Sequence, residues 1–285
     1  MSAIQRIAHR MVVAMASLIA TMAFAQPNPA APGACGEVVT IPTHSNTTTR
    51  YAFASPPSAK VAVILLAGGG GHLDLDDKGC PRALTGNSLV RSIPNFHSAG
   101  FATALVDAPS DYPGDDGLGG FRIAADHAED LGKIIADLRT RTKAPVWLIG
   151  TSRGSISAAN AAARLSGPAA ADGVVVTSAL MYGNRGQKSW VAQTLFDVAL
   201  ESIRMPVLVV GHAEDKCLRS PPDQMDRITA RTNGAREQVV TVTGGPGRSG
   251  APSLAACEGR SPHGFVDQEA EVAAGIARFI GGGKY

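Results

Sequence analysis

Short apolar runs alternate along the chain with longer stretches in which apolar residues recur every three or four positions. The run at residues 61–67 is typical, because it is continuous, too short for a helix and followed by four glycines. These features indicate a strand that is buried on both faces. Similar runs predict further strands at residues 102–106, 146–149, 174–177, 207–210 and 238–242. Helical patterns between them predict helices at residues 87–99, 122–140, 155–165, 189–202, 222–232 and 268–280.

This alternation indicates the fold class. Two earlier strands, at residues 37–41 and 48–54, are separated by a polar turn and are expected to form an antiparallel edge. Buried strands that alternate with amphipathic helices predict an α/β fold: a mostly parallel, doubly wound sheet of about eight strands with helices on both faces. The chain has 285 residues, of which 45% are hydrophobic, so it can bury a large core and is not a disordered chain. We predict one domain at residues 35–285.

The first residues have the pattern of an export signal. Arg6 and Arg10 precede an apolar stretch, and the small residues Ala-Phe-Ala follow at 23–25. We therefore predict a signal peptide at residues 1–25 and a flexible leader at residues 26–34. The apolar stretch holds about 15 residues, fewer than the roughly 20 that span a bilayer. We expect a periplasmic or secreted protein with no stable membrane anchor after cleavage.

The charge of the chain argues against two classes of partner. The formal net charge of +2 comes from Arg6 and Arg10, because the remaining residues carry 24 basic and 24 acidic side chains. A neutral mature chain has no electrostatic basis for binding nucleic acid or an anionic membrane. The sequence leaves the oligomeric state open.

A serine in a glycine-rich turn is the first candidate for catalysis. In open α/β sheets, ligands bind at the carboxyl ends of the strands. There, the predicted strand at residues 146–149 runs into Gly-Thr-Ser-Arg-Gly at residues 150–154, and a helix of small residues follows. This segment fits G-x-S-x-G, whose glycines let the chain turn sharply and hold the serine in a strained, exposed position. We therefore predict that Ser152 is a nucleophile.

A serine nucleophile needs a base, and the base needs an acid that orients it. In this type of sheet they follow the serine in the order acid, then histidine. Asp215 follows the predicted strand at residues 207–210, and His263 lies just before the last predicted helix. Glu214, which adjoins Asp215, is the alternative acid.

Other histidines compete with His263 for the role of base: His72, His97, His127 and His212. His72 and His212 lie near the ends of predicted strands and are candidate pocket-lining residues. His127 is expected on a partly exposed helix face, and His44 is expected in a solvated edge turn.

With these motifs, the chain resembles the α/β-hydrolase fold enzymes, including those similar to dienelactone hydrolase, over nearly the whole mature sequence. Ser152, Asp215 and His263 match the nucleophile, the acid and the base of that family. The resemblance implies a serine hydrolase of this fold. About 30 residues separate the predicted strands that begin at 174 and 207, so we expect little or no lid.

The same resemblance implies an oxyanion hole. Its first donor would be the backbone N–H of Arg153, and its second would come from the glycines after the third strand. The candidates for the second donor are Gly69, Gly70 and Gly71. The chain departs here from the His-Gly-Gly-Gly order of lipases, because His72 follows the glycines.

The glycine run does not fit a nucleotide-binding loop. Leu73 or Asp74 occupies the third glycine position of G-x-G-x-x-G, and the chain contains no G-x-x-x-x-G-K-[ST]. The nearby acidic residues, Asp74, Asp76 and Asp77, lack the spacing of a calcium-binding loop. We expect no cofactor and no metal.

The four cysteines indicate disulfides. An even number in an exported chain is typical of two disulfides, and the close cysteine pairs of a zinc site are missing. Three pairings are open. We favour Cys35–Cys80 and Cys217–Cys257, because in the expected fold each would join neighbouring loops. The second bond would tie the loop of the predicted acid to the loop of the predicted base.

These observations predict a secreted serine hydrolase that cleaves small-molecule or polymeric carboxylic esters through an acyl-enzyme. Thioesterase, polyester hydrolase and peptidase activities on the same fold are alternatives. A non-catalytic secreted binding protein is an alternative of another class. Arg153 and Arg122 could steer a substrate that bears a carboxylate.

Overall fold

The computed structural model describes residues 35–184, 186, 188–247 and 250–285. The predicted signal peptide (1–25) and leader (26–34) lie outside the described residues. Among the helices that are described, none is long and apolar enough to cross a membrane.

One sheet of eight strands runs through the described chain. Its strands are β1 (Glu37–Pro42), β2 (Thr48–Ala54), β3 (Val61–Leu66), β4 (Phe101–Val106), β5 (Val146–Thr151), β6 (Gly173–Thr177), β7 (Val207–His212) and β8 (Glu237–Val242). Their order in the sheet is β1-β2-β4-β3-β5-β6-β7-β8. The pairs from β4 to β8 are parallel, whereas β1 pairs with β2, and β2 with β4, in antiparallel fashion. The predicted sheet and its antiparallel edge are confirmed.

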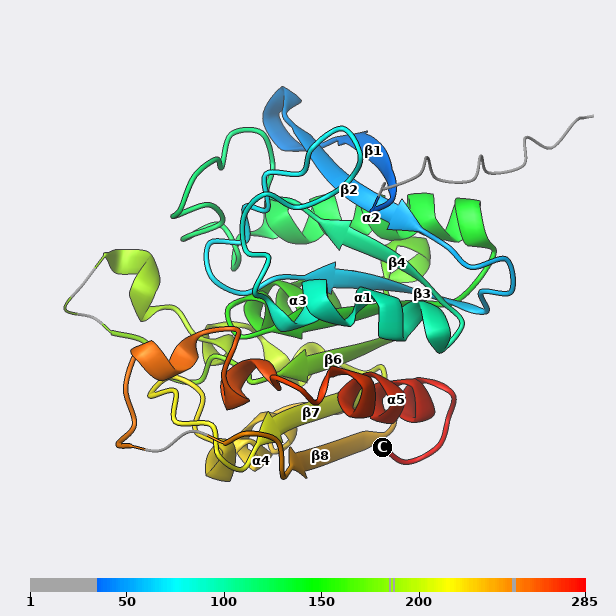
Figure 1. Ribbon diagram of the computed structural model, residues 1–285. Coiled ribbons are helices and arrows are strands. Elements are labelled where there is room, and N and C mark those ends of the chain that lie inside the picture. Colours follow the sequence, from blue (N-terminus) through cyan, green and yellow to red (C-terminus); the bar gives the residue numbers. More distant parts are fainter. Residues whose placement is uncertain (1–34, 185, 187, 248–249) are drawn as a thin grey trace, which may run out of the picture.

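Helices cover both faces of this sheet. The α-helices are α1 (Ser88–Ser98), α2 (Ala125–Thr142), α3 (Gly154–Arg164), α4 (Asp226–Thr229) and α5 (Glu269–Ile280). Helices α1 and α5 lie on one face, and α2 and α3 lie on the other (Figure 1). Successive residues of a buried strand point to opposite faces. In β3, accordingly, Ile64 packs in the core beneath α2 and α3, and Leu65 packs in the core beneath α1 and α5.

The helix predicted at residues 189–202 is wrong. The structure has three short 3-10 helices there, Ser189–Ala192, Leu195–Asp197 and Leu200–Ser202. Within this segment the Thr194 hydroxyl accepts a hydrogen bond from the backbone of Phe196, and the Asp197 carboxylate accepts one from the backbone of Thr194. Such local capping starts a new helix and so prevents one continuous helix.

The helix predicted at residues 222–232 is also shorter than expected. A 3-10 turn, Pro222–Gln224, precedes α4, which has only four residues. Pro221 and Pro222 provide no backbone N–H to this first turn. At the other end, the Thr232 hydroxyl bonds to Glu237 at 2.6 Å as the chain turns into β8.

The carboxyl ends of the parallel strands meet at one edge of the sheet, where the orange segment before α5 also lies (Figure 1). The disulfide Cys35–Cys80 ties the start of β1 to the segment that follows β3. The disulfide Cys217–Cys257 joins the segment after β7 to the segment before α5. The structure thus contains both of the favoured pairings, and the second bond lies at the edge where the predicted catalytic residues gather.

Candidate active site

Ser152 lies in a sharp turn between β5 and α3. Its φ of +50° is in the left-handed region, which is uncommon for a residue other than glycine. The turn is possible because the motif glycines leave room: a Cβ on Gly150 would lie 2.3 Å from the carbonyl oxygen of Gly154, and one on Gly154 would lie 2.0 Å from that of Leu66. The Ser152 N–H donates to the carbonyl of Thr177 on β6 at 2.9 Å. The strand-turn-helix context expected for G-x-S-x-G is therefore present.

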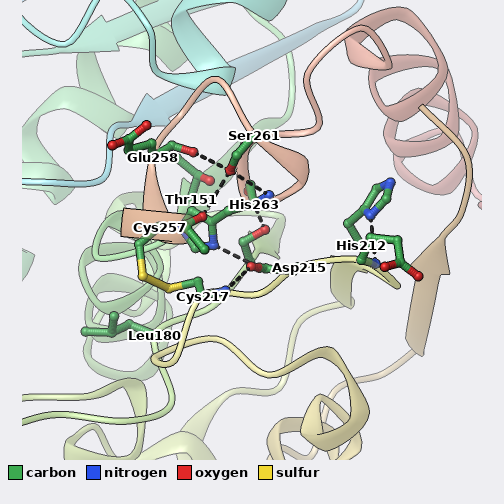
Figure 2. Close-up of polar contacts among 12 residues, drawn as sticks. Thr151, Leu180, His212, Asp215, Cys217, Cys257, Glu258, Ser261 and His263 are labelled. Carbon is green, nitrogen blue, oxygen red and sulfur yellow. Dashed lines mark hydrogen bonds and ion pairs between the residues drawn. A yellow bond between two sulfur atoms is a disulfide. The ribbon is translucent and has the colours of Figure 1, made fainter. Parts of the chain in front are cut away.

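Asp215 and His263 form a buried pair. The Asp215 Oδ2 and His263 Nδ1 atoms are 2.8 Å apart, and the two residues are 5% and 3% exposed (Figure 2). The other carboxylate oxygen of Asp215 accepts a hydrogen bond from the backbone N–H of Cys217 at 2.7 Å. Because the carboxylate accepts from Nδ1–H, the lone pair of the neutral imidazole lies on Nε2. Glu214, the alternative acid, instead pairs with Lys216 at the surface.

Ser152 and His263 line the same cavity, which has a volume of about 280 Å³. The His263 Nε2 atom is buried and has no hydrogen-bond partner among the described residues. No hydrogen bond joins it to the Ser152 hydroxyl in this part of the chain. In serine hydrolases without substrate, the hydrogen bond between nucleophile and base is often long and tightens only in the reacting complex.

The segment that carries His263 is held to its surroundings at several points. We call residues 254–264 the histidine loop. The Ser178 hydroxyl donates to the backbone carbonyl of His263 at 2.7 Å, and the Ser261 hydroxyl accepts from the His263 N–H at 3.2 Å. The Cys217–Cys257 bond lies beside the Asp215–His263 pair (Figure 2). Asp215, Cys217 and His263 present possible metal ligands within 4.8 Å of one another, but the disulfide removes the thiolate that such a site requires.

The glycines after β3 form a second loop at the cavity. We call residues 67–75 the glycine loop. Gly68 and Gly69 line the cavity, whereas Gly70 and Gly71 do not. The Gly71 N–H already donates to the Gly68 carbonyl at 3.2 Å. Of the three candidates for the second oxyanion donor, Gly69 alone both lines the cavity and has no hydrogen bond on its N–H within the described chain.

The two candidate pocket-lining histidines do not line this cavity. The His72 Nδ1 atom accepts a hydrogen bond from the backbone of Gly114 at 3.1 Å. His212 is buried, and its Nε2 atom lies 2.7 Å from Gln268 and 3.0 Å from the carbonyl of Gly244. It lies to one side of the Asp215–His263 pair (Figure 2). The His72 ring therefore bonds to backbone outside the cavity, and the His212 ring bonds to backbone and to the Gln268 side chain.

Two other histidines differ from their predicted environments. The side chain of His44 is only 11% exposed and lies between Asp130 and Asp111, with its Nδ1 atom 2.5 Å from Asp130 and its Nε2 atom 3.1 Å from Asp111. His127 is 3% exposed, and burial, with smaller contributions from the charges of Arg122 and His44, lowers its pKa to about 3. The predictions of a solvated His44 and of a partly exposed His127 are wrong, because tertiary contacts cover both.

Arg91 of α1 is a residue that the sequence did not single out. Its side chain is 14% exposed and bonds to the carbonyls of Gly259 and Gly264 at 2.9 and 2.8 Å, and also to the carbonyl of Gly86. Its Nη2 atom lies 2.7 Å from Glu269 at the start of α5. Arg91 thus fastens the histidine loop from both sides of His263. No local sequence pattern predicts this role, because Gly259 and Gly264 are more than 160 residues away from Arg91 in the sequence.

The comparisons with known proteins agree with this geometry. The sequence matches no protein-family model and no curated protein. Among solved structures, the chain is similar to an esterase of Pyrococcus furiosus, with 13% identity and a TM-score of 0.60, over 87% of this chain and 91% of that one. It is similar to an esterase of Rhodococcus sp. with 14% identity and a TM-score of 0.58, over 86% of this chain and 98% of that one. It is also similar to a dienelactone hydrolase of Anabaena variabilis, with 15% identity and a TM-score of 0.53, over 87% of this chain and all (100%) of that one. The sheet order, the serine turn and these likenesses together identify the architecture: the chain has the α/β-hydrolase fold.

Proposed function

We propose that the protein is a serine hydrolase that cleaves carboxylic esters. The observation that carries this proposal is the buried Asp215–His263 pair. The Nε2 atom of His263 has no hydrogen-bond partner in the described chain, and His263 lines the same cavity as Ser152. A histidine oriented by a buried carboxylate, with a free Nε2, is the arrangement that a serine needs for activation. That several solved structures of the same fold are esterases adds support.

The reaction would begin with Ser152. Its hydroxyl oxygen attacks the ester carbonyl while His263 Nε2 takes the hydroxyl proton, and Asp215 stabilises the resulting imidazolium. The tetrahedral intermediate then collapses, and His263 returns the proton to the departing alcohol. Water, activated by the same imidazole, attacks the acyl-enzyme and releases the acid. Each proton taken by Nε2 is given back, so the cycle leaves Ser152 and His263 as they began.

The negative oxygen of the intermediate requires hydrogen-bond donors. We assign this role to the backbone N–H groups of Arg153 and Gly69. Arg153 follows the nucleophile, and Gly69 lines the cavity with an N–H that has no partner in the described chain. Donors already in place at the position of the developing charge are often the largest contribution to catalysis.

The cavity favours an uncharged ester over one that bears a carboxylate. Arg122, one of the two arginines that could steer an anion, is 3% exposed and does not line the cavity. Arg153 instead lies over the ring of Trp190, with 4.5 Å between the guanidinium carbon and the ring centroid. Glu258 lines the cavity and would repel a carboxylate.

A location outside the cytoplasm also belongs to this proposal. Both disulfides join segments at least 40 residues apart. Bonds of this kind form and persist in an oxidising compartment, such as the periplasm or the medium.

Replacement of the nucleophile is the decisive experiment. Ser152→Ala should lower the turnover of p-nitrophenyl acetate about a million-fold, because the variant lacks the hydroxyl that forms the acyl-enzyme in this proposal. It should also abolish labelling by a fluorophosphonate probe, which reacts with activated serines. Circular dichroism should show the fold of the wild type.

A matched control is Ser98→Ala, which removes an exposed hydroxyl that donates to the Pro94 carbonyl. This variant should keep full activity and labelling. Undiminished labelling of a folded Ser152→Ala variant would overturn the proposal, and a wild type that neither labels nor cleaves any ester would favour a non-catalytic binding protein.

A further inference from the structure

A fully buried arginine lies behind the glycine loop. Arg122 precedes α2 and is 3% exposed. Its guanidinium donates to the carbonyl oxygens of Ala67 and Gly69 at 3.1 and 3.2 Å, and to the Ser157 hydroxyl at 2.8 Å. All three acceptors are neutral, and no carboxylate in the described part of the chain pairs with it. A buried charge without a counter-ion is costly, so this position calls for a reason other than stability.

The segment to which Arg122 bonds would not keep a single backbone conformation by itself. Residues 68–71 are four consecutive glycines, and glycine has the largest conformational freedom of any residue. The structure holds two of them, Gly69 and Gly71, at φ values of +59° and +79°. Without external contacts such a run would sample many backbone conformations, and an N–H donor within it would have no fixed direction.

Hydrogen bonds hold three successive backbone carbonyls of the glycine loop. Arg122 holds those of Ala67 and Gly69, and the Gly71 N–H holds that of Gly68 between them. In a planar trans peptide, the C=O and the following N–H point in opposite directions. Fixing these three carbonyls therefore fixes the directions of the next three N–H groups, including that of Gly69 at the cavity.

The guanidinium packs directly against the glycine loop. A Cβ built on Gly71 would lie 2.5 Å from the Nη2 atom of Arg122. Burial, with a smaller contribution from the charge of Arg153, lowers the pKa of Arg122 to about 9, so the side chain remains positively charged at neutral pH. A positive charge in such a poorly solvated place acts more strongly on nearby negative charge than it would in water.

The far end of the glycine loop is held by the opposite charge. Asp107 follows β4, and its carboxylate accepts hydrogen bonds from the backbone of Leu73 at 2.6 Å and of Leu75 at 3.0 Å. Arg122 and Asp107 both line a cavity of about 10 Å³ beneath the loop. A buried cation on the carbonyls at one end and a buried anion on the amides at the other give the loop two fixed points.

We propose that Arg122 is a positioning residue for the oxyanion hole, which holds the four-glycine loop so that the Gly69 N–H faces the developing oxyanion. This inference rests on the proposed function. It assigns to Arg122 a role in transition-state stabilisation rather than in binding of the substrate ground state. Substitution of Arg122 should therefore lower kcat and leave KM nearly unchanged.

The test compares two variants of Arg122 with a matched arginine. Arg122→Lys keeps the charge but loses the planar fork that reaches three acceptors, and Arg122→Met removes both. We expect kcat for p-nitrophenyl acetate to fall about 10-fold in Arg122→Lys and about 100-fold in Arg122→Met, with KM within about 3-fold of wild type. The control is Arg236→Lys. Arg236 also bonds two carbonyls, at 2.7 Å each, but at the opposite edge of the sheet, and its variant should keep wild-type kcat.

A second readout separates positioning from a general loss of structure. 1-Butaneboronic acid forms a tetrahedral adduct with an activated serine and places an oxygen in the oxyanion hole. Its inhibition constant should rise in parallel with the fall in kcat/KM for both Arg122 variants and should not change for Arg236→Lys. If Arg122→Met fails to fold, the variants Ser157→Ala and Arg122→Lys together test whether Arg122 positions the oxyanion hole. Ser157→Ala removes one acceptor of the guanidinium and should lower kcat about 3-fold at unchanged KM.

The outcomes are distinct for the two proposals. Folded Arg122 variants with the kcat of Arg236→Lys, or with wild-type boronate affinity, would overturn this inference alone, because the wild type would still be an active serine hydrolase. A wild type inert to both ester and fluorophosphonate would overturn the proposed function, and the inference with it. Arg122 variants should still react with the fluorophosphonate, although slowly, whereas Ser152→Ala should not react at all.

Discussion

The glycine loop and the histidine loop both reach the cavity of Ser152, but they are fastened by different means. The glycine loop is held by noncovalent contacts, chiefly those of the buried charges of Arg122 and Asp107. The histidine loop is held by the Cys217–Cys257 bond and by Arg91, whose charge is paired with Glu269. In each loop an arginine bonds to backbone carbonyls. Within the described residues, Arg91 at the histidine loop pairs with a carboxylate, whereas Arg122 at the glycine loop does not.

This difference corresponds to what each loop must provide. In the proposed reaction, the histidine loop presents a side chain that gains and loses a proton, so an unpaired positive charge next to it would disfavour the imidazolium. In the same proposal, the glycine loop presents backbone donors to an oxygen that becomes negative, so an unpaired positive charge behind it would be favourable. The two loops therefore suggest that the pairing of each arginine follows the charge that develops in front of it.

The disulfides provide the largest expected effect. Cys35–Cys80 and Cys217–Cys257 close segments of similar length, with sequence separations of 45 and 40. Replacing either pair by alanines should therefore lower the free energy of unfolding by a similar amount, about 4 kcal/mol on a chain-entropy estimate. Urea unfolding at one temperature measures both losses.

Activity should distinguish these two double variants. We expect kcat to fall about 10-fold in Cys217→Ala/Cys257→Ala, because the loops of Asp215 and His263 lose their covalent link. The Cys35→Ala/Cys80→Ala variant should keep wild-type kcat wherever it is folded. Equal kcat losses in the two folded variants would contradict a local role for the bond at the site.

A smaller effect is expected at Arg91. Arg91→Lys retains the ion pair with Glu269 but cannot bond to the carbonyls of Gly259 and Gly264 together. We expect kcat to fall about 5-fold, with little change in KM, because His263 is held less well. Glu269→Gln is the matched control, since it removes the ion pair and leaves the carbonyl bonds. If Glu269→Gln lowered kcat as much as Arg91→Lys, the ion pair and not the grip on the loop would be responsible.

The sheet could be predicted from the sequence, because each strand has its own local hydrophobic pattern. A continuous apolar run such as residues 61–67 indicates burial on both faces without knowledge of its neighbours. The turn around Ser152 could also be predicted from the sequence, because close approaches within and around the turn require its glycines. Asp215 and His263 could be proposed from their order along the chain, although the 2.8 Å contact between them could not.

The hydrogen bonds of Arg122 and Arg91 to the two loops could not be predicted from local patterns. The bonds of Arg122 to the glycine loop span more than 50 residues, and those of Arg91 to the histidine loop span more than 160. His127 is a different case, because a signal was present. It lies four positions before Leu131 and seven before Ile134, on the buried face of α2. Helical periodicity applied through His127 would have placed it in the core.

The smallest effect concerns a titratable contact behind the glycine loop. His44 joins Asp130 of α2, which also binds Lys133, to Asp111 in the segment after β4. That segment reaches the glycine loop, since the Leu118 N–H donates to the Gly70 carbonyl at 2.8 Å. Burial acts to lower the pKa of His44, but the hydrogen bonds to Asp130 and Asp111, together with the negative charges of these two side chains, outweigh burial, and the pKa is raised above its usual value.

Because the folded pKa of His44 is raised, its contribution to stability is fully present below the unfolded value of about 6.5 and is lost as the pH rises through the raised pKa. The Tm of wild type should therefore exceed that of His44→Gln by about 2 °C near pH 5.5, and the difference should shrink as the pH approaches 8. The Tm deficit of Cys217→Ala/Cys257→Ala should stay constant over the same range, because a disulfide does not titrate. If the Tm difference between wild type and His44→Gln does not change with pH, His44 stabilises the fold by packing. Its protonation would then not stabilise the segment after β4 that contacts the glycine loop.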